Sequence, residues 1–433
     1  MFENLFKLSE NGTTVRIEVM AGLTTFLTMA YIIIVNPDIM STTGMDKGAL
    51  FVATCLAAAV GCFIMGLWAN YPIALAPGLG LNAFFAFGVV GGMGVPWQTA
   101  LGVIFLSGVF FLIITILPIR VWIINSIPKS LKMSISAGIG LFIGVIALEI
   151  AGISVQGDPA PLVTLGAITS TEAILVAVGF VAIVGLDRLG IKGAIVIGII
   201  ATTILAHIFG AASGTNMNFE IPSLAPTFLQ LDIAGALQLS MISVIIAFLF
   251  VDMFDTAGTL IGVSHRAGLL DEDGKLPRMG KALSADSIAT VTGSMLGSST
   301  VTSYIESASG VREGGRTGLT AVTVGILFVL ALILAPIIGL VPRFATAPAL
   351  LFVAVLMVRG LTELDWDDVT EYAPAVLAAV VMPFTFSIAH GIAFGFITYA
   401  AAKIVSGRFN EASPAVYALA VGFGLLYGFD LIG

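Results

Sequence analysis

The sequence has 433 residues, of which 58% are apolar and only 10% are Asp, Glu, Lys or Arg, and its mean hydropathy is +1.08. A soluble domain usually carries about 25% charged residues, so this composition excludes a large soluble catalytic domain, a nucleic-acid-binding protein and a secreted disulfide scaffold. It predicts a polytopic membrane protein. The formal net charge of −8 indicates little about partners, because the charges lie in loops and at a few positions within apolar segments.

Fourteen apolar segments follow one another along the chain and are predicted to cross the lipid bilayer. They are residues 19–35, 48–68, 73–90, 97–118, 134–153, 171–187, 191–210, 237–262, 282–297, 301–312, 318–340, 346–360, 369–386 and 388–405. A fifteenth segment, 414–430, is expected to lie on the membrane surface or to insert halfway. The polar stretch Met1 to Glu18 does not resemble a cleavable signal peptide, so the first span is expected to be an uncleaved anchor. Cys55 and Cys62 are two helical turns apart, too far for a disulfide, and are expected to be packing residues.

The positions of the cations support this topology. With a cytoplasmic N-terminus, sixteen of the eighteen Lys and Arg residues fall on the cytoplasmic side, and only Lys47 and Arg343 fall outside. Cytoplasmic loops of membrane proteins are enriched in Lys and Arg. The distribution therefore favours fourteen crossings of the cell (inner) membrane with the N-terminus in the cytoplasm.

Two of the predicted spans are too short or too polar for an ordinary helix. Segment 73–90 contains Pro77, Gly78 and Gly80, and segment 297–312 opens with the hydroxyl-rich stretch GSSTVT. Extended backbone at membrane depth is tolerated only where it lines a cavity. The two segments are the third spans of two successive sets of seven, and interrupted helices in corresponding positions are typical of transporters with repeats and a midplane site. Because seven is odd, the two repeats must be inverted relative to each other.

Five carboxylates lie within the apolar segments. They are Glu149, Asp252, Asp255, Asp286 and Glu306. A carboxylate in hydrocarbon is costly unless it is protonated, paired or facing water, so each is a functional hypothesis. Asp252 and Asp255 share a helix face in the eighth span, and Glu306 follows the extended part of the tenth. Asp286 and Glu149 lie nearer the ends of their spans, where a packing or interfacial role is expected.

These groups predict a polar pocket with apolar walls. The half-helices that follow the extended stretches begin with free N–H groups, and Asn82 stands near one of these starts. Carboxylates accept N–H bonds, an Asn amide donates and accepts, and Phe84, Phe85, Phe87 and Phe254 are available to stack on a ring. The set suits a neutral planar solute such as a nucleobase. A buried carboxylate could also carry a proton inward with it.

Structural interpretations stay open for the same residues. Asp255 and Glu306 could form a structural pair, Asp252 could only orient the site, and Asn82 could only cap its half-helix. His207, His265 and His390 are scattered along the chain, so neither a metal site nor a cofactor is expected.

Four motifs together resemble a known family. The motifs are TTFLTMAYIIIVNP at 24–37, PGLGLNAFF at 77–85, VDMFDTAGTL at 251–260 and STVTSYIESASGV at 299–311. They resemble the signatures of the AzgA-like purine permeases of the nucleobase–ascorbate transporter superfamily, and the resemblance covers essentially the whole chain. It implies an all-α, UraA-like fold of fourteen transmembrane segments in two inverted seven-span repeats, with short antiparallel strands in spans 3 and 10. The implied parts are 1–132 and 237–342, which form the core, and 133–236 and 343–433, which form the gate.

The resemblance also implies a function, which is import of adenine, guanine or hypoxanthine by proton symport, with elevator-like movement of the core against the gate and no enzymatic activity. The expected substrate-binding residues are Asp255, Glu306, Asn82, Gly80, Asp252, Ser303 and Phe85, and the proton-coupling candidates are Asp252, Asp255 and Glu306. The apolar gate spans fit either lipid or a second subunit, so a homodimer stays open.

The residues leave two other functions open, and both are disfavoured. An anion transporter of the same fold, of the sulfate or bicarbonate type, is disfavoured because the predicted pocket is acidic. An intramembrane aspartyl protease is disfavoured because Asp252 and Asp255 stand one turn apart on a single helix, whereas two catalytic aspartates would need to face each other.

Overall fold

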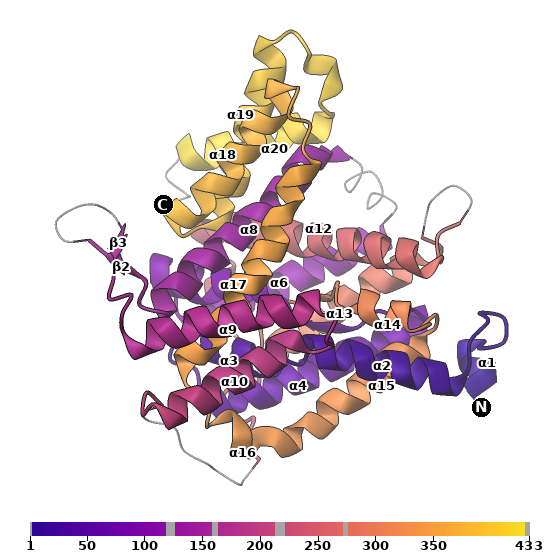
Figure 1. Cartoon of the computed structure of the whole chain (residues 1–433). Helices are drawn as coiled ribbons and strands as arrows, with labels where there is room; N and C mark the ends of the chain where they lie inside the picture. The colour runs from indigo at the N-terminus through magenta and orange to yellow at the C-terminus, as the bar shows by residue number, and fades with distance from the viewer. Residues whose placement is uncertain (1, 118–125, 158–162, 213–220, 272–275, 429–433) are drawn as a thin grey trace.

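The structure is a computed structural model that describes residues 2–117, 126–157, 163–212, 221–271 and 276–428. Its elements are almost all helical (Figure 1). The first part of the chain forms α1 (Phe2–Phe6), α2 (Val15–Met29), α3 (Ile32–Ser41), α4 (Lys47–Ile64), η1 (Met65–Ala69), β1 (Leu75–Pro77), α5 (Leu79–Ala83), η2 (Phe84–Gly92) and α6 (Trp97–Ile116). The next part forms α8 (Lys129–Ile150), β2 (Ser154–Gln156), β3 (Val163–Leu165), α9 (Thr171–Arg188) and α10 (Ala194–Ile208).

The described part of the second half of the chain forms a further series of helices and one strand. It forms α11 (Ile233–Ala236), η3 (Leu239–Met241), α12 (Ile242–Ala267), α13 (Met279–Leu296), β4 (Val301–Ser303), α14 (Ser307–Arg312), α15 (Gly318–Leu330), η4 (Ala331–Leu334) and α16 (Ala335–Ile338). It then forms η5 (Arg343–Thr346), α17 (Ala347–Val358), η6 (Arg359–Glu363), α18 (Val369–Thr385), α19 (Ile388–Val405), η7 (Phe409–Glu411) and α20 (Pro414–Gly428).

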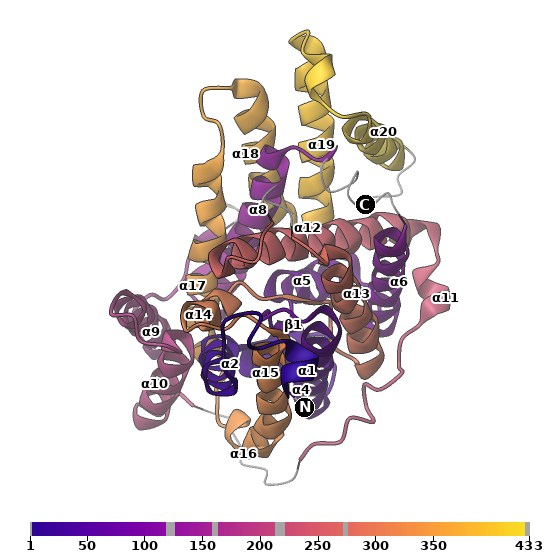
Figure 2. The ribbon, with the colours of Figure 1, turned by 90° about the vertical axis from the view of Figure 1, so that its right-hand side faces the viewer.

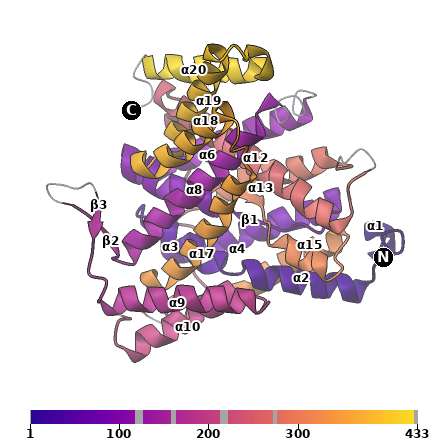
Figure 3. The same cartoon turned by 45° about the horizontal axis from the view of Figure 1, so that its top comes forward.

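The helices pack in two groups. One group, the α4 bundle, contains α2, α3, α4, α6, α12, α13 and α15; the other, the α8 bundle, contains α8, α17, α18 and α19. Figure 2 shows α12 lying across the molecule between the upright α18 and α19 and the rest of the α4 bundle. Helices α9 and α10 pack against each other and against α17, and they form one edge of the molecule (Figure 3).

Many of the helices are long and apolar enough to span a lipid bilayer. Among the described residues, 8 helical stretches are long and apolar enough to cross a bilayer, and shorter apolar helices cover 79–92, 194–208, 369–385 and 414–428. The prediction of an all-α polytopic membrane protein is therefore confirmed. Each of the fourteen predicted spans overlaps a described helix. The number of crossings, the inverted repeats and the division into core and gate parts stay predictions.

The antiparallel strands predicted for spans 3 and 10 are present. β1 pairs with β4, and Leu75 lies opposite Ser303. Side chains complete the hydrogen bonding of the two outer edges. Cys62 Sγ lies 3.2 Å from both the N and the O of Leu75, and Thr290 Oγ1 bonds the O and the N of Val301 at 2.9 and 3.1 Å. Because unpaired backbone groups are costly in hydrocarbon, these two side chains allow a two-stranded sheet to exist there.

The first span differs from its expected bounds. Helix α2 begins at Val15, and the helical path breaks at Ala30–Tyr31 before α3 continues to Ser41. Glu18 lies in this span and is fully buried, although the sequence analysis placed it in a polar leader. It is tolerated there because its carboxylate accepts hydrogen bonds from the backbone N–H groups of Arg316 and Thr320, at 2.9 and 3.2 Å, where α15 begins. A buried carboxylate with these partners acts as a helix cap.

Helix α20 is held against α19 by ring contacts. The Phe423 ring lies 6.2 Å from that of Phe396, and the Tyr427 ring lies 5.9 Å from those of His390 and Phe394. The expectation that 414–430 lies on the membrane surface or inserts halfway stays a prediction, and Asp430 falls outside the described residues. Both cysteines are free and buried, as expected, and Cys62 has the additional role at Leu75.

Candidate functional site

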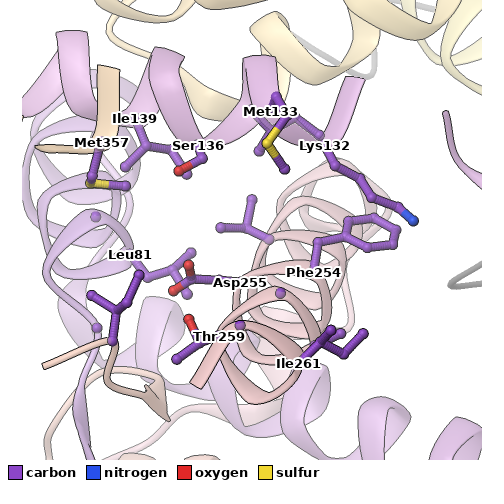
Figure 4. Close-up of a pocket in the computed structure, with 18 of the residues that line it drawn as sticks. Leu81, Lys132, Met133, Ser136, Ile139, Phe254, Asp255, Thr259, Ile261 and Met357 are labelled. Carbon is purple, nitrogen blue, oxygen red and sulfur yellow. The ribbon is translucent and has the colours of Figure 1, made fainter. Parts of the chain in front are cut away.

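A cavity of about 470 Å³ separates the two helix groups, where α5 and α12 face α8 (Figure 4). In Figure 4, Asp255 and Thr259 from α12 point across it toward Met133, Ser136 and Ile139 from α8. The other lining residues are Gly78, Gly80, Leu81, Lys132, Ile135, Val251, Phe254, Ala257, Gly258, Ile261, Gly262, Arg266, Ile305, Met357 and Glu363. We call this space the α12 cavity. Of the predicted site residues, it is lined directly by Asp255 and Gly80.

The two eighth-span aspartates have different environments. Asp255 is exposed to the cavity, and its Oδ2 lies 3.4 Å from the hydroxyl of Thr302, a long contact. Asp252 is fully buried one turn earlier and accepts a 3.2 Å bond from Thr290, while its Oδ1 has no partner among the described residues. A helix turns about 100° per residue, so three residues leave a difference of about 60°. That difference is enough to point one carboxylate into the cavity and the other behind β4.

Asp286 belongs to the same polar network, although the sequence analysis favoured a packing role near a span end. Its Oδ1 accepts bonds from Thr256 at 2.8 Å and from Ser303 at 3.4 Å, and its Oδ2 has no partner among the described residues. The hydroxyls of Thr256 and Thr302 are 2.8 Å apart. Hydroxyl groups therefore connect buried Asp286 with Asp255 at the cavity. These hydroxyls come from α12 and from the region of β4, so the signals in the sequence are Thr256 beside Asp255 and the TVTS stretch at 300–303.

Glu306 lies beside the α12 cavity. Its neighbour Ile305 lines the cavity, and Glu306 is half-buried and close enough to Asp255 for the two carboxylates to interact electrostatically. Tyr31 donates a 2.8 Å hydrogen bond to Glu306 Oε1. Sequence analysis missed Tyr31, because nothing local to the break between α2 and α3 indicates a partner in the tenth span.

The remaining predicted residues lie behind the cavity wall. Asn82 is fully buried; its Oδ1 accepts a hydrogen bond from Ser299, and its Nδ2 has no partner among the described residues. Ser303 is buried and directs its hydroxyl to Asp286, and Phe85 is fully buried. The roles of these three residues in substrate binding stay predictions.

Phe254 is the aromatic residue that lines the cavity. Its ring is parallel to that of Phe250 at a centroid distance of 5.7 Å, and Lys132 Nζ from α8 lies 5.8 Å from its centroid. The site therefore combines the Asp255 carboxylate, hydroxyls and an aromatic ring within largely apolar walls. Lys132, Arg266 and Glu363 add further charged groups. This arrangement can bind a polar planar molecule by hydrogen bonding and stacking. Among the described residues, no group of three His, Cys, Asp or Glu side chains is arranged to hold a metal ion.

Comparison with known proteins decides the family. Residues 16–426 match the model of the permease family Xan_ur_permease. The chain belongs to this permease family. It is therefore a multi-pass membrane transporter and not an enzyme, which leaves the aspartyl protease alternative without support.

Curated relatives cover nearly the whole permease. The chain is 50% identical to the adenine permease AdeP of Escherichia coli (strain K12) over 98% of this chain and 95% of that protein. It is 46% identical to the guanine/hypoxanthine permease PbuG of Bacillus subtilis (strain 168) over 99% of both. The solved transmembrane domain of the cyanobacterial bicarbonate transporter BicA matches with a TM-score of 0.69 and 14% identity, covering 88% of this chain and 97% of that one. That likeness shows a shared fold.

Proposed function

We propose that this permease imports purine nucleobases (adenine, guanine or hypoxanthine) across the cell membrane. The observation that carries the proposal is the Asp255 carboxylate, which is exposed in an otherwise largely apolar cavity beside the ring of Phe254. A purine presents N–H donors along its edge and a flat π-surface, so Asp255 would accept N–H bonds while Phe254 supports the ring. The adenine and guanine/hypoxanthine permeases among the relatives support the same substrate class.

Glu306 would complete the site from the tenth span. Its carboxylate is held by Tyr31 and lies near Asp255, so a purine between them could donate from two edges. A cavity of about 470 Å³ is of the size that binds small organic molecules.

We propose that transport is coupled to protons through the buried carboxylates. Asp252, Asp255 and Glu306 remain the candidates from the sequence, and Asp286 joins them because Thr256 and Thr302 connect it to Asp255. Hydroxyl groups both donate and accept, so a row of them can pass a proton between two carboxylates. Asp252 and Asp286 each keep one carboxylate oxygen without a described partner, which favours a protonated form of one of them.

Movement of the core (1–132 and 237–342) against the gate (133–236 and 343–433) would expose the site alternately. The α12 cavity lies along the first half of α8, and Lys132, Arg266 and Glu363 line it. If the protein lies in the inner membrane with its N-terminus in the cytoplasm, the N-terminal end of α8 faces the cytoplasm. The structure would then represent an inward-facing state, in lipid either as a single copy or as a homodimer.

Uptake of labelled purines into proteoliposomes with an imposed pH gradient tests the proposal. Wild type should accumulate a purine in a gradient-dependent manner, and Asp255→Asn and Glu306→Gln should abolish uptake while Asp365→Asn, a change in an exposed loop, should not. Normal proton-dependent uptake by correctly inserted Asp255→Asn and Glu306→Gln proteins would remove the proposed site. Competition by sulfate or bicarbonate instead of purines would favour the anion-transporter alternative.

The proposed proton path from Asp286 through Thr256 and Thr302 to Asp255 can be tested separately. Asp286→Asn and Thr302→Val should leave purine exchange measurable and reduce accumulation driven by the pH gradient, since neither residue lines the cavity. Equal loss of exchange and accumulation would indicate a structural role for both residues.

A further inference from the structure

A second cavity, of about 410 Å³, opens at the other end of α8. The α12 cavity contacts α8 at residues 132–139, and the second cavity contacts it at 146–150. From Ile139 to Ile146 is seven residues, or about 10 Å along a helix. In the proposed topology this end of α8 faces the outside, so we call the second space the outer cavity.

The two cavities lie on one seam, between α8 and the segment formed by α5 and η2. The α12 cavity is lined by Gly80 at the start of α5, and the outer cavity by Phe87 in η2, which continues the same helical segment. The segment between them is closed by buried apolar side chains, among them Phe84 and Ile143. A solute that enters from outside along this seam reaches the outer cavity before the α12 cavity.

Charged side chains of both signs line the outer cavity. Glu149 and Glu172 contribute two carboxylates, and Arg343 contributes a guanidinium. All three residues are exposed. No side-chain hydrogen bond or ion pair joins them to one another or to other described residues, although Arg343 is close enough to Asp38 for an electrostatic interaction. Phe87 and Phe344 add aromatic walls. Opposite charges within one cavity would ordinarily pair, so the separation leaves donors and acceptors available to a bound molecule.

We propose that the outer cavity is a separate binding site for the purine that arrives from outside. The carboxylates would accept its N–H groups, and the Arg343 guanidinium would donate to ring nitrogens or to a carbonyl oxygen. The inference rests on the proposed function, and it goes beyond it by assigning a second site with residues that do not touch the first.

The test measures occupancy of the outer cavity when the α12 site is disabled. Ala211 lines the outer cavity, and the native cysteines are buried, so Ala211→Cys gives a single reporter for a membrane-impermeant thiol reagent added outside. In the Asp255→Asn/Ala211→Cys protein, adenine or hypoxanthine should slow labelling. At a purine concentration about ten times Kd, mass action predicts roughly tenfold slower labelling. Adding Arg343→Gln should remove the protection.

Matched controls separate a site from a general conformational change. Thr42→Cys lies in the loop after α3, outside the cavity, and should be labelled at the same rate with and without purine. Arg359→Gln, at the opposite end of α17 from Arg343, should leave the protection of Ala211→Cys intact.

Each outcome decides the inference. The inference would be overturned if purine failed to protect Ala211→Cys from labelling in the Asp255→Asn protein. It would also be overturned if purine still protected Ala211→Cys after Arg343→Gln was added. Protection by sulfate and not by purines would overturn the ligand class. In each of these cases the proposed function survives if wild type takes up purine, whereas wild type without purine uptake would reject the proposed function itself.

Discussion

The phenol of Tyr31 donates a 2.8 Å hydrogen bond to Glu306 across 275 residues of sequence. Tyr31 stands at the break between α2 and α3, and Glu306 directly precedes α14. Two interrupted segments from different halves of the chain are thus joined at a carboxylate proposed to bind substrate. Tyr31 is not among the residues that line the α12 cavity, so in the proposed site it would act on the substrate through Glu306, as a positioning residue.

Tyr31→Phe should weaken purine binding without unfolding the protein. The substitution keeps the ring and removes one donor to a charged acceptor, which contributes about 1.5–3 kcal/mol, or roughly 10- to 150-fold in Kd. Equilibrium binding to purified protein measures it. Tyr372→Phe serves as the control, because the hydroxyl of Tyr372 has no hydrogen bond with another described residue. An unchanged Kd in Tyr31→Phe would show that Glu306 needs no orientation.

Gly80→Ala should slow transport by obstructing the contact between α5 and α8. A Cβ at Gly80 would lie 2.2 Å from Ile139 Cγ2, so that side chain must shift. Overpacking of this kind costs about 1–3 kcal/mol, roughly 5- to 150-fold in rate if it falls on the moving state. Uptake rates measure the effect, and Ile139→Ala should partly restore them. Gly258→Ala is the matched control, since it lines the same cavity and its added Cβ would meet no atom within 4 Å.

Lys403→Met should destabilise the α8 bundle. The Lys403 side chain is fully buried, and its Nζ lies 2.7 Å from Glu371 and 2.9 Å from Glu411. Glu371 also accepts bonds from Ser130 and Tyr399, so the cluster joins α8, α18 and α19. Unpairing the two carboxylates should cost about 1–3 kcal/mol, visible as a lower Tm.

The control for that substitution is Lys129→Met. Lys129 and Glu363 form an exposed pair at 3.0 Å, and such pairs contribute about 0–1 kcal/mol. Equal losses of Tm in the two variants would show that burial of Lys403 adds nothing.

The same region predicts a pH dependence of stability. Hydrogen bonds from Thr370 and Arg408 lower the pKa of Asp368, the N-cap of α18, from 3.8 to about 2. Because the pKa of Asp368 is lower in the folded state, its ionised carboxylate contributes fully to stability above about pH 3.8. That contribution is lost as the pH falls toward about 2. The Tm difference between wild type and Asp368→Asn should therefore shrink over this range in detergent. Asp365→Asn controls for removal of one charge from the same loop, and a constant difference for Asp368→Asn would contradict the prediction.

Much of the fold could be predicted because its signals are local. Long apolar segments predict spans, and the Pro, Gly and hydroxyl-rich stretches at 73–90 and 297–312 predict interrupted helices with extended backbone, since each signal depends only on neighbouring residues. The antiparallel strands themselves are implied by the family resemblance. The place of Asp255 in a cavity followed from the cost of a carboxylate in hydrocarbon.

The contacts that sequence analysis missed join distant segments. Glu18 resembled part of a polar leader because its partners Arg316 and Thr320 are 298 and 302 residues away in the sequence. Asp286 looked peripheral because α13 begins at Met279, three residues before the predicted span. Which of two aspartates faces a cavity depends on the neighbouring helices, and no spacing rule contains that information.

The pairing of β1 with β4 constrains how the protein is made. At roughly 5–20 residues per second, synthesis reaches residue 301 about 10–45 s after residue 75. During that interval the backbone of β1 has no strand partner, and unpaired backbone is not stable against lipid. The segment that contains β1 must therefore wait in the translocation machinery or near the membrane surface, and it becomes insertion-competent only when β4 arrives.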